Sequence, residues 1–502
     1  MKTFKVFLKN GIILTATSLF LRLVGIIFNT YISNAVGAEG MGVYSLVQSV
    51  FGFGVTFACS GINLGATRLV SEALAKDNYK EIKKSVRVCV CYSLLFSGIA
   101  CISLFCGAEY IGTVFLKDTR TVKSLRMLAL ALPFISLSSV FSGYFSAMRR
   151  VYKNALVMIS EQFVRITVTV RLVSLYPFKS VEYACVGVAL GTIISEFGAL
   201  VFNLILLYFD YRKILDKKEK PCSGISKKLA GISLPLALST YIRSGLVTVE
   251  HLLIPFGLRK NGASYSLSMS TYGIVQGMVL PLILFPSCII YSFSGLLVPE
   301  IAAMKERQEY EKINKAVSNV IKYALYFSIG VAGILMCYSY ELSMIFYNSS
   351  EAYEYIWLFA PLVTVMYLDG AIDGILKGLN EQLHSMKINI ADALISVLLV
   401  YYLVPLLGVK GYIIAVFVSE IFNCSMSLIR LVKICSPGIS ISKFVVKPII
   451  SAIVSIGLVV FLFNNFNITF LGSGLNLAFR IACTAGVYLI ILFHKTKIKL
   501  GV

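Results

Sequence analysis

The sequence has few charged residues and no polar stretch long enough to form a soluble domain. Only 14% of its 502 residues are charged, whereas 57% are hydrophobic and the mean hydropathy is +0.82. The apolar segments are apolar on all sides, without the amphipathic stripe that helices around a water-soluble core carry. This composition predicts an all-α integral membrane protein that crosses the bilayer many times.

The sequence also lacks the spacings typical of metal and redox sites. Its twelve cysteines form no CxxC pair, none is spaced with a histidine as a metal-binding pair, and most lie inside apolar segments. Cysteines in such surroundings pack as small apolar side chains. We therefore expect no metal, no cofactor and no catalytic residue.

Fourteen apolar segments of the sequence are long enough to span a bilayer, at a helical rise of ~1.5 Å per residue. An even number of spans puts both chain ends on the same side of the membrane. The predicted spans are residues 11–33, 42–66, 88–108, 126–147, 154–177, 183–208, 229–256, 271–297, 318–340, 355–376, 388–408, 411–429, 448–466 and 473–493.

Basic residues are unevenly distributed between the two sides of this topology. With both termini inside, the inner segments hold thirty-two lysines and arginines and the outer segments hold seven. This bias is the positive-inside rule, and it predicts a protein of the cytoplasmic membrane with cytoplasmic termini. The net charge of +21 then faces cytoplasm and anionic lipid, so we expect membrane lipids and no nucleic acid as partners, and a monomer.

Four of the six arginines inside predicted spans are candidate cavity residues, because a charge in a span costs at least ~2.5 to 3.5 kcal/mol and is expected to face a bundle interior or a watery cavity. A planar guanidinium donates paired hydrogen bonds to phosphate oxygens, which predicts a cavity that binds a diphosphate. For Arg22, at the centre of the first span, the alternative is a structural role at an interface or beside a buried acid. The four arginines are Arg22, Arg165, Arg171 and Arg243.

Acidic residues inside the spans are candidates for ion coupling. Paired carboxylates in a membrane bind a sodium ion or exchange a proton, so coupling to Na⁺, H⁺ or the membrane potential is expected. Glu161 and Arg165 are four residues apart, so an internal salt bridge is the alternative for them. For Asp369 and Asp373 the alternative is pairing with Lys377. The candidate acids are Glu161, Glu196, Glu250, Asp369 and Asp373.

Spans 1–6 and spans 7–12 carry matching residues at matching spacings, which indicates an internal repeat. Two repeats of six spans share one orientation and are related by an axis along the membrane normal, with the substrate site between them near the midplane. The sequence thus predicts an N-terminal lobe (1–220), a C-terminal lobe (221–437) and two added helices (438–502). The matched pairs are Arg22 and Arg243, Gly143 and Gly374, Glu161 and Asp392, Gly187 and Gly411, and Glu196 and Glu420.

The first hairpin carries a specific series of motifs: Arg-Leu-Val-Gly at 22–25, Gly-Ala-Glu-Gly at 37–40 followed by Gly42 and Tyr44, and Gly-Ile-Asn-Leu at 61–64. This order resembles the stage V sporulation protein B branch of the multidrug/oligosaccharidyl-lipid/polysaccharide (MOP) exporter superfamily, which also contains the lipid II flippases. The fourteen spans extend the resemblance over the whole chain.

Two positions depart from that pattern. Asn63 stands where the branch usually has proline, so the helix break expected there is softened. Residues 276–281 carry no charge, whereas better-known lipid II flippases have a further cavity arginine in the eighth helix, so identical substrate chemistry does not follow. Pro281 and Pro286 in the same span predict kinks, since each removes an internal hydrogen bond.

The resemblance implies a transporter, not an enzyme. It is expected to move an undecaprenyl-diphosphate-linked sugar or peptidoglycan precursor to the outer leaflet by alternating access, in cell-wall, polysaccharide or sporulation metabolism. Spans 13 and 14 are expected to form a groove for the lipid tail.

Two other functions fit the sequence less well. A cation-coupled multidrug antiporter of the same superfamily would favour acids over arginines in the N-terminal lobe. A membrane-embedded transferase would need a catalytic pair, and Glu250 and His251 are the candidates. Adjacent helix positions diverge by ~100°, so these two side chains do not readily serve one substrate.

The topology yields a direct prediction. Reporter fusions around Lys217 and Asn348 should report cytoplasm and exterior respectively, because the first linker is densely basic and the second carries only acids. Both reporters on the same side would overturn the number of spans.

Overall fold

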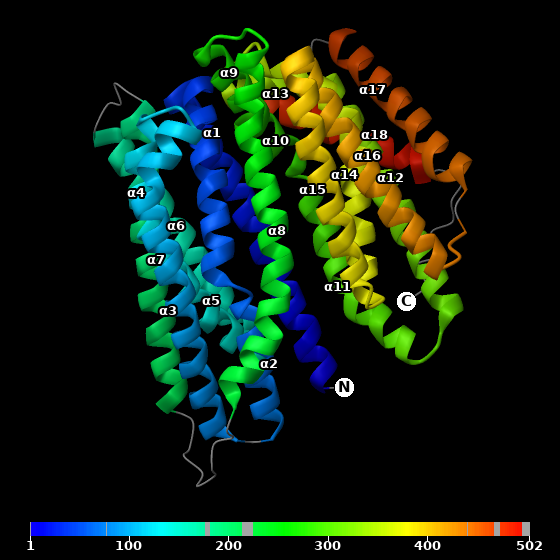
Figure 1. Cartoon of the computed structure of the whole chain (residues 1–502). Coiled ribbons are helices and arrows are strands. Elements are labelled where there is room, and N and C mark those ends of the chain that lie inside the picture. The colour runs from blue at the N-terminus through cyan, green and yellow to red at the C-terminus, as the bar shows by residue number, and fades with distance from the viewer. Residues whose placement is uncertain are drawn as a thin grey trace. The chain divides into compact units, whose positions relative to one another are not determined.

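The computed structural model describes residues 2–76, 78–175, 181–212, 224–438, 440–465 and 472–493. The chain is helical through nearly all of these residues and forms no strand in them (Figure 1), which confirms the predicted all-α class. The basic linker around Lys217 and residues 494–502 lie outside the described part.

Twelve helical segments in the described residues are long and apolar enough to cross a membrane. The first, Thr15–Ala75, is 61 residues long and holds the first two predicted spans. The predicted fifth span coincides with helix α6, Val151–Leu175, which is absent from these twelve and carries Glu161, Arg165 and Arg171. The multi-pass membrane architecture is thus established, and the number fourteen stays a prediction.

The chain divides into two compact units. Unit 1 comprises residues 1–28, 35–273 and 400–406, and unit 2 comprises residues 29–34, 274–399 and 407–502. Helix α8, which the sequence assigns to the C-terminal lobe, has its contacts within unit 1. The lobe boundaries at 220 and 437 stay predictions.

In the described residues, unit 1 is built from nine helices, one π-helical segment and residues 400–406 of α15 (Gln382–Leu407). Its elements are α1 (Lys2–Cys59, except residues 29–34), α2 (Ile62–Ala75), α3 (Tyr79–Tyr110), η1 (Ile111–Phe115), α4 (Arg120–Ala129), α5 (Leu132–Ala147), α6 (Val151–Leu175), α7 (Val181–Arg212), α8 (Ile225–Lys260) and α9 (Tyr265–Tyr272).

Two backbone breaks divide the first helical segment. Gly37 has φ 71° inside α1, a left-handed value that glycine adopts without steric cost. It separates the first two predicted spans. Ser60 and Gly61, with φ 45° and 68°, end α1 and start α2. The break expected near Asn63 therefore lies at Gly61, and Asn63 itself is helical.

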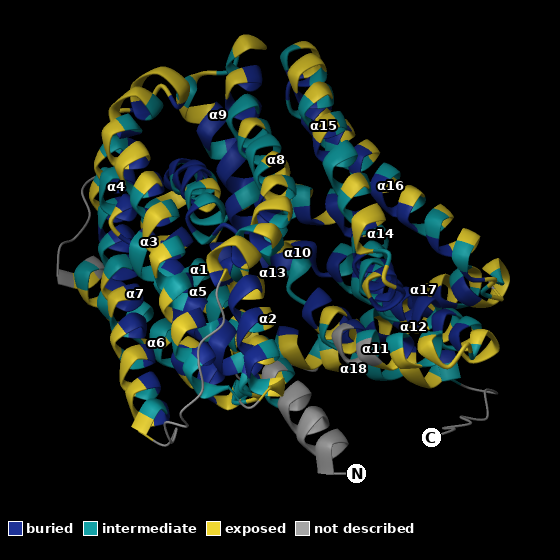
Figure 2. Ribbon diagram, turned by 60° about the horizontal axis from the view of Figure 1, so that its bottom comes forward, coloured by how far each residue is buried: buried dark blue, intermediate teal, exposed yellow. Residues whose placement is uncertain are grey.

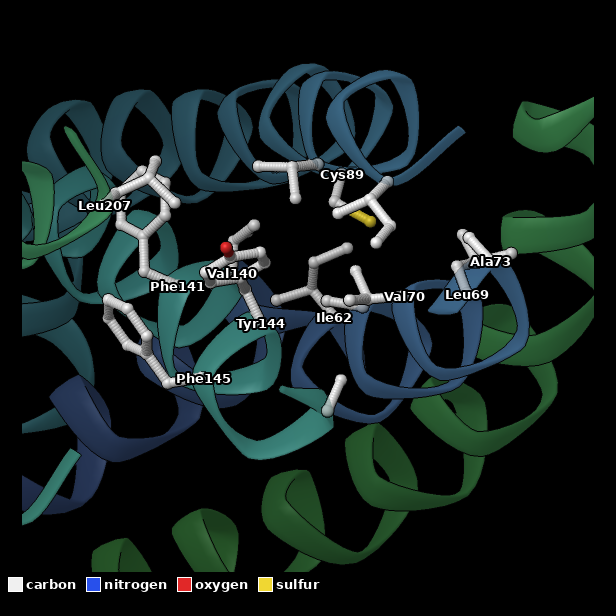
Figure 3. Packing of buried hydrophobic residues seen from close by; sticks show 14 of the residues in the cluster. Ile62, Leu69, Val70, Ala73, Cys89, Val140, Phe141, Tyr144, Phe145 and Leu207 are labelled. Atoms are coloured by element: carbon white, nitrogen blue, oxygen red, sulfur yellow. The ribbon is translucent and has the colours of Figure 1, made fainter. Parts of the chain in front are cut away.

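Buried apolar side chains of α2, α3, α5, α7 and α8 form the core of unit 1 (Figure 3). Tyr144, Phe141 and Val140 of α5 pack among Ile62 and Val70 of α2, and all five side chains are less than 5% exposed. The core fixes the N-terminal end of α8 against α2. A salt bridge between Lys228 and Glu72 adds to this contact.

Unit 2 contains the elements from the second half of the chain. They are η2 (Gly273–Val279), α10 (Leu280–Leu284), α11 (Ser287–Glu306), α12 (Tyr310–Cys337), α13 (Ser339–Tyr347), α14 (Ala352–Gly378), α15 (Gln382–Leu407, except residues 400–406), α16 (Val409–Ile434), η3 (Ser442–Val446), α17 (Lys447–Asn465) and α18 (Ser473–Phe493). Pro286 lies in the break between α10 and α11, with backbone angles in the helical region, so the kink predicted there stays a prediction.

The two units repeat one packing scheme. In unit 1, α2 packs on α3 and α5, α3 on α5, and α5 on α7; in unit 2, α11 packs on α12 and α14, α12 on α14, and α14 on α16. Each unit has a glycine at the matching helix contact, Gly143 of α5 against α2 and Gly374 of α14 against α11. A methyl group at Gly143 would lie 2.6 Å from the Asn63 carbonyl oxygen, and one at Gly374 would lie 2.6 Å from Ser294 Cβ. This agreement supports the predicted repeat.

Many large apolar residues are exposed along the helices. Figure 2 marks the exposed residues of each helix in yellow. On α3 they follow the helical period, and Ile102 reaches 66% exposure. A bilayer solvates such a surface, whereas water does not.

The close approach at Gly143 can be tested with one methyl group. We expect Gly143→Ala to destabilise the protein by about 1–3 kcal/mol, because overpacking against the α2 backbone forces the helices apart. Gly198→Ala is the matched control, since nothing lies within 4 Å of a methyl group there. Thermal unfolding in detergent measures both, and equal melting temperatures would contradict the packing scheme.

Candidate functional site

A polar cavity lies between α1 and α8 in unit 1. Its volume is about 510 Å³, and Arg243 is its charged lining residue, exposed on α8. Most of the other lining residues bear hydroxyl, amide or imidazole groups. The lining is Gln48, Ser49, Gly52, Phe53 and Thr56 from α1, and Thr240, Arg243, Ser244, Val247, Thr248 and His251 from α8.

Hydrogen bonds between hydroxyl groups and backbone hold α1 and α8 together along the cavity. Ser244 Oγ donates to Thr56 Oγ1 at 3.2 Å. Thr248 Oγ1 donates to the Ser49 carbonyl at 3.3 Å. These bonds satisfy polar groups that would otherwise face hydrocarbon. They also orient the face of α8 that carries Arg243.

Of the four predicted arginines, the structure brings Arg243 into this cavity. Arg22 is exposed on α1 but is not among the described residues that line it. Arg171 is exposed on α6. Arg165 lies in a different site.

Arg165 joins α6 to α7 through two carboxylates. Its Nη2 lies 2.5 Å from Glu161 Oε1 and 3.0 Å from Glu196 Oε1. Its Nε donates to Ser195 Oγ at 3.4 Å. The helices come close because Gly191 has no side chain where a methyl group would lie 2.1 Å from Thr169 Oγ1. This geometry favours the structural alternative for Glu161 and Arg165, and a substrate role for Arg165 stays a prediction.

The predicted acids of unit 2 have partners of their own. Asp373 forms a salt bridge with Lys377 at 2.7 Å and accepts a hydrogen bond from Ser385. Asp369 Oδ2 accepts from Asn423 at 3.1 Å. Pairing of Asp373 with Lys377, the alternative that the sequence left open, is thus present.

The repeat extends to these polar contacts. Asp392, the counterpart of Glu161, accepts a hydrogen bond from Ser419 Oγ at 2.5 Å. Ser419 occupies the position in α16 that Ser195 occupies in α7. Each unit therefore links its corresponding helix pair through a polar contact to a serine at the matching position, Ser195 in α7 and Ser419 in α16.

His251 and Glu250 differ in surroundings. His251 lines the cavity, and its Nδ1 lies 2.8 Å from the Tyr272 hydroxyl. Glu250 is not among the described lining residues. Of the two, the structure therefore places His251 at this cavity.

The sequence prediction did not include the uncharged polar residues that line the cavity. Thr240, Ser244, Thr248 and His251 recur at three- or four-residue intervals on α8, which places them on one face. That polar stripe inside an apolar helix was a detectable signal.

A second polar cluster joins three helix connections of unit 1. Arg120 Nη2 lies 2.9 Å from both Glu39 and Asp118, and Ser266 donates to Glu39. Burial raises the pKa of Asp118, but hydrogen bonds from Arg120 and Tyr265 outweigh burial and hold that pKa below its ordinary value. The cluster therefore stabilises the fold at neutral pH, and this contribution is lost as the pH falls through the lowered pKa.

Residues 7–299, more than half of the chain, match the profile of the family described as "Polysaccharide biosynthesis protein". The chain belongs to this family. Among its relatives is stage V sporulation protein B of Bacillus subtilis (strain 168). The two sequences are 26% identical over 98% of this chain and 96% of the relative.

Solved structures show the same fold for this family member. Lipid II flippase MurJ in an inward closed conformation aligns with a TM-score of 0.72 at 14% identity, over 96% of this chain and 98% of that one. An inward-facing multidrug resistance MATE family transporter of the MOP superfamily aligns with a TM-score of 0.63 at 17% identity, over 82% and 93%. The predicted resemblance to MOP superfamily transporters is confirmed. These similar proteins are transporters and flippases, not enzymes.

The role of Arg165 is testable by charge removal. We expect Arg165→Gln to destabilise the protein by about 1.5–3 kcal/mol, because two carboxylates then lose their charged hydrogen-bond partner. Replacing Glu161, Arg165 and Glu196 together with glutamine should restore part of the loss. Arg171→Gln, on the same helix but exposed, should leave the melting temperature unchanged. A stable Arg165→Gln variant would argue against the structural role.

Proposed function

We propose that this protein is a flippase for a lipid-linked sugar, an undecaprenyl-diphosphate-linked glycan or peptidoglycan precursor, in the cytoplasmic membrane. The observation that carries the proposal is the α1–α8 cavity. Among its described lining residues Arg243 is charged and no carboxylate is present. The kinship with stage V sporulation protein B and the MurJ-like fold support a lipid-linked substrate.

The cavity chemistry suits a diphosphate attached to a sugar. A guanidinium donates two parallel hydrogen bonds to phosphate oxygens, and it stays charged at all physiological pH values. The hydroxyl and amide groups of Gln48, Thr56 and Thr240 match sugar hydroxyls. Arg22 would add a second cation when α1 moves during transport.

The direction and energy source are also part of the proposal. The positive-inside bias supports cytoplasmic termini, and alternating access of the two repeats would carry the head group outward. A Na⁺ or H⁺ gradient or the membrane potential would drive the cycle. The acids inside the spans, Glu161, Glu196, Glu250, Asp369 and Asp373, are the coupling candidates.

The charge of the cavity disfavours the competing antiporter function. An organic cation would need a carboxylate or an aromatic cage in the cavity. The described lining offers an arginine and one phenylalanine, Phe53. The likeness to a MATE family transporter concerns the fold alone.

The proposal predicts how Arg243 variants bind a lipid diphosphate. Arg243→Lys keeps the charge but loses the two-pronged donor, so it should bind several-fold more weakly, and Arg243→Ala should lose at least tenfold. A hydrogen bond to a charged group is worth ~1.5–3 kcal/mol, which corresponds to roughly 10- to 150-fold in affinity. Arg22→Ala should also weaken binding. Binding of undecaprenyl diphosphate to purified variants measures the effect.

Arg259→Lys is the matched control, because Arg259 is in the last turn of α8 and outside the cavity. Melting temperatures check the folding of every variant. Normal binding by folded Arg243→Ala would remove the main support for an anionic substrate.

A further inference from the structure

A second polar pocket lies in unit 2, between α13 and the first two turns of α18. Its volume is about 490 Å³. It contains both an acid, Glu341, and a base, Arg480, together with Ser473, Asn476 and Tyr340. The predicted site residues and the α1–α8 cavity do not include any of these residues.

The two charges of this pocket do not neutralise each other. Among the described residues, neither Arg480 nor Glu341 takes part in an ion pair, so they lie too far apart to pair with each other. The Arg480 guanidinium lies over the ring of Phe463, 5.2 Å from the ring centre. Within the described part, Arg480 Nε and Asn476 Oδ1 are covered yet have no hydrogen-bond partner. The pocket can therefore bind a polar ligand that carries one positive and one negative charge.

The pocket lies at the end of a candidate membrane span. Ser473 is the first residue of the span Ser473–Phe493. Arg480 follows two turns later, ~10 Å along the axis, within reach of the interface for a side chain that extends its charge toward water. Tyr340 and Tyr353 contact each other edge to face, and Trp357 is exposed nearby in sequence. Tyrosine and tryptophan gather at the level of lipid head groups.

We propose that the pocket binds the head group of a zwitterionic aminophospholipid. The phosphate accepts hydrogen bonds from Arg480, and the ammonium lies against Glu341. An ethanolamine phosphodiester carries these two charges a few ångströms apart, so it bridges residues that do not reach each other. An anionic phospholipid offers the same phosphate but gives Glu341 no partner. This site is independent of the proposed transport substrate.

The test is lipid binding to the purified full-length protein by native mass spectrometry. Phosphatidylethanolamine, phosphatidylglycerol and undecaprenyl diphosphate are titrated separately. The wild type should prefer phosphatidylethanolamine to phosphatidylglycerol by several-fold. Arg480→Gln should lower the affinity for both phospholipids at least tenfold, because the phosphate loses its charged donor.

Glu341→Gln should remove the preference while binding to phosphatidylglycerol persists, and Glu341→Lys should reverse it. The Glu341 variants keep the proposal testable if Arg480→Gln fails to fold. Arg126→Gln is the control, because Arg126 pairs with an exposed Glu109 elsewhere. Unchanged preference in Glu341→Gln, unchanged phospholipid binding in folded Arg480→Gln, or competition by undecaprenyl diphosphate at this site would overturn the proposal.

Discussion

The cost of placing charge in hydrocarbon is the constraint on which this structure depends. An ionisable group inside a span must be paired, extend to the interface or face a polar cavity. Arg165 meets the requirement through Glu161 and Glu196, and Asp373 meets it through Lys377. Arg243 meets it by facing the α1–α8 cavity. That contrast separates charges that hold helices together from a charge that is available to a ligand.

Close helix packing makes these polar contacts possible. Small residues let backbones approach within membranes, where apolar side chains gain little by leaving lipid. Gly191 brings α7 against Thr169 of α6, and Gly143 and Gly374 do the same for the central helix pairs of the two units. Gly191 thus brings together the helices that carry the Arg165 cluster, and Gly143 and Gly374 mark the repeat.

The sequence predicted the class and the hydrophobic segments, and it offered the pairing of Glu161 with Arg165 as one of two alternatives, because each depends on composition or on spacing within one helix. It did not predict that Glu196 completes the Arg165 cluster. That contact requires the register of α6 against α7, which Gly191 and Thr169 set through three-dimensional packing. The α1–α8 cavity was missed for a similar reason, since hydroxyl groups on two distant helices become a site only when the helices meet.

Transport itself is the most direct test of the account. Purified protein is reconstituted into vesicles that carry a fluorescent undecaprenyl-diphosphate-linked sugar in both leaflets, and a membrane-impermeant quencher is added outside. The account predicts that the protected inner pool becomes accessible much faster than in protein-free vesicles. An inner pool that stays protected at the protein-free rate, in vesicles whose protein remains folded, would contradict the proposed flippase function.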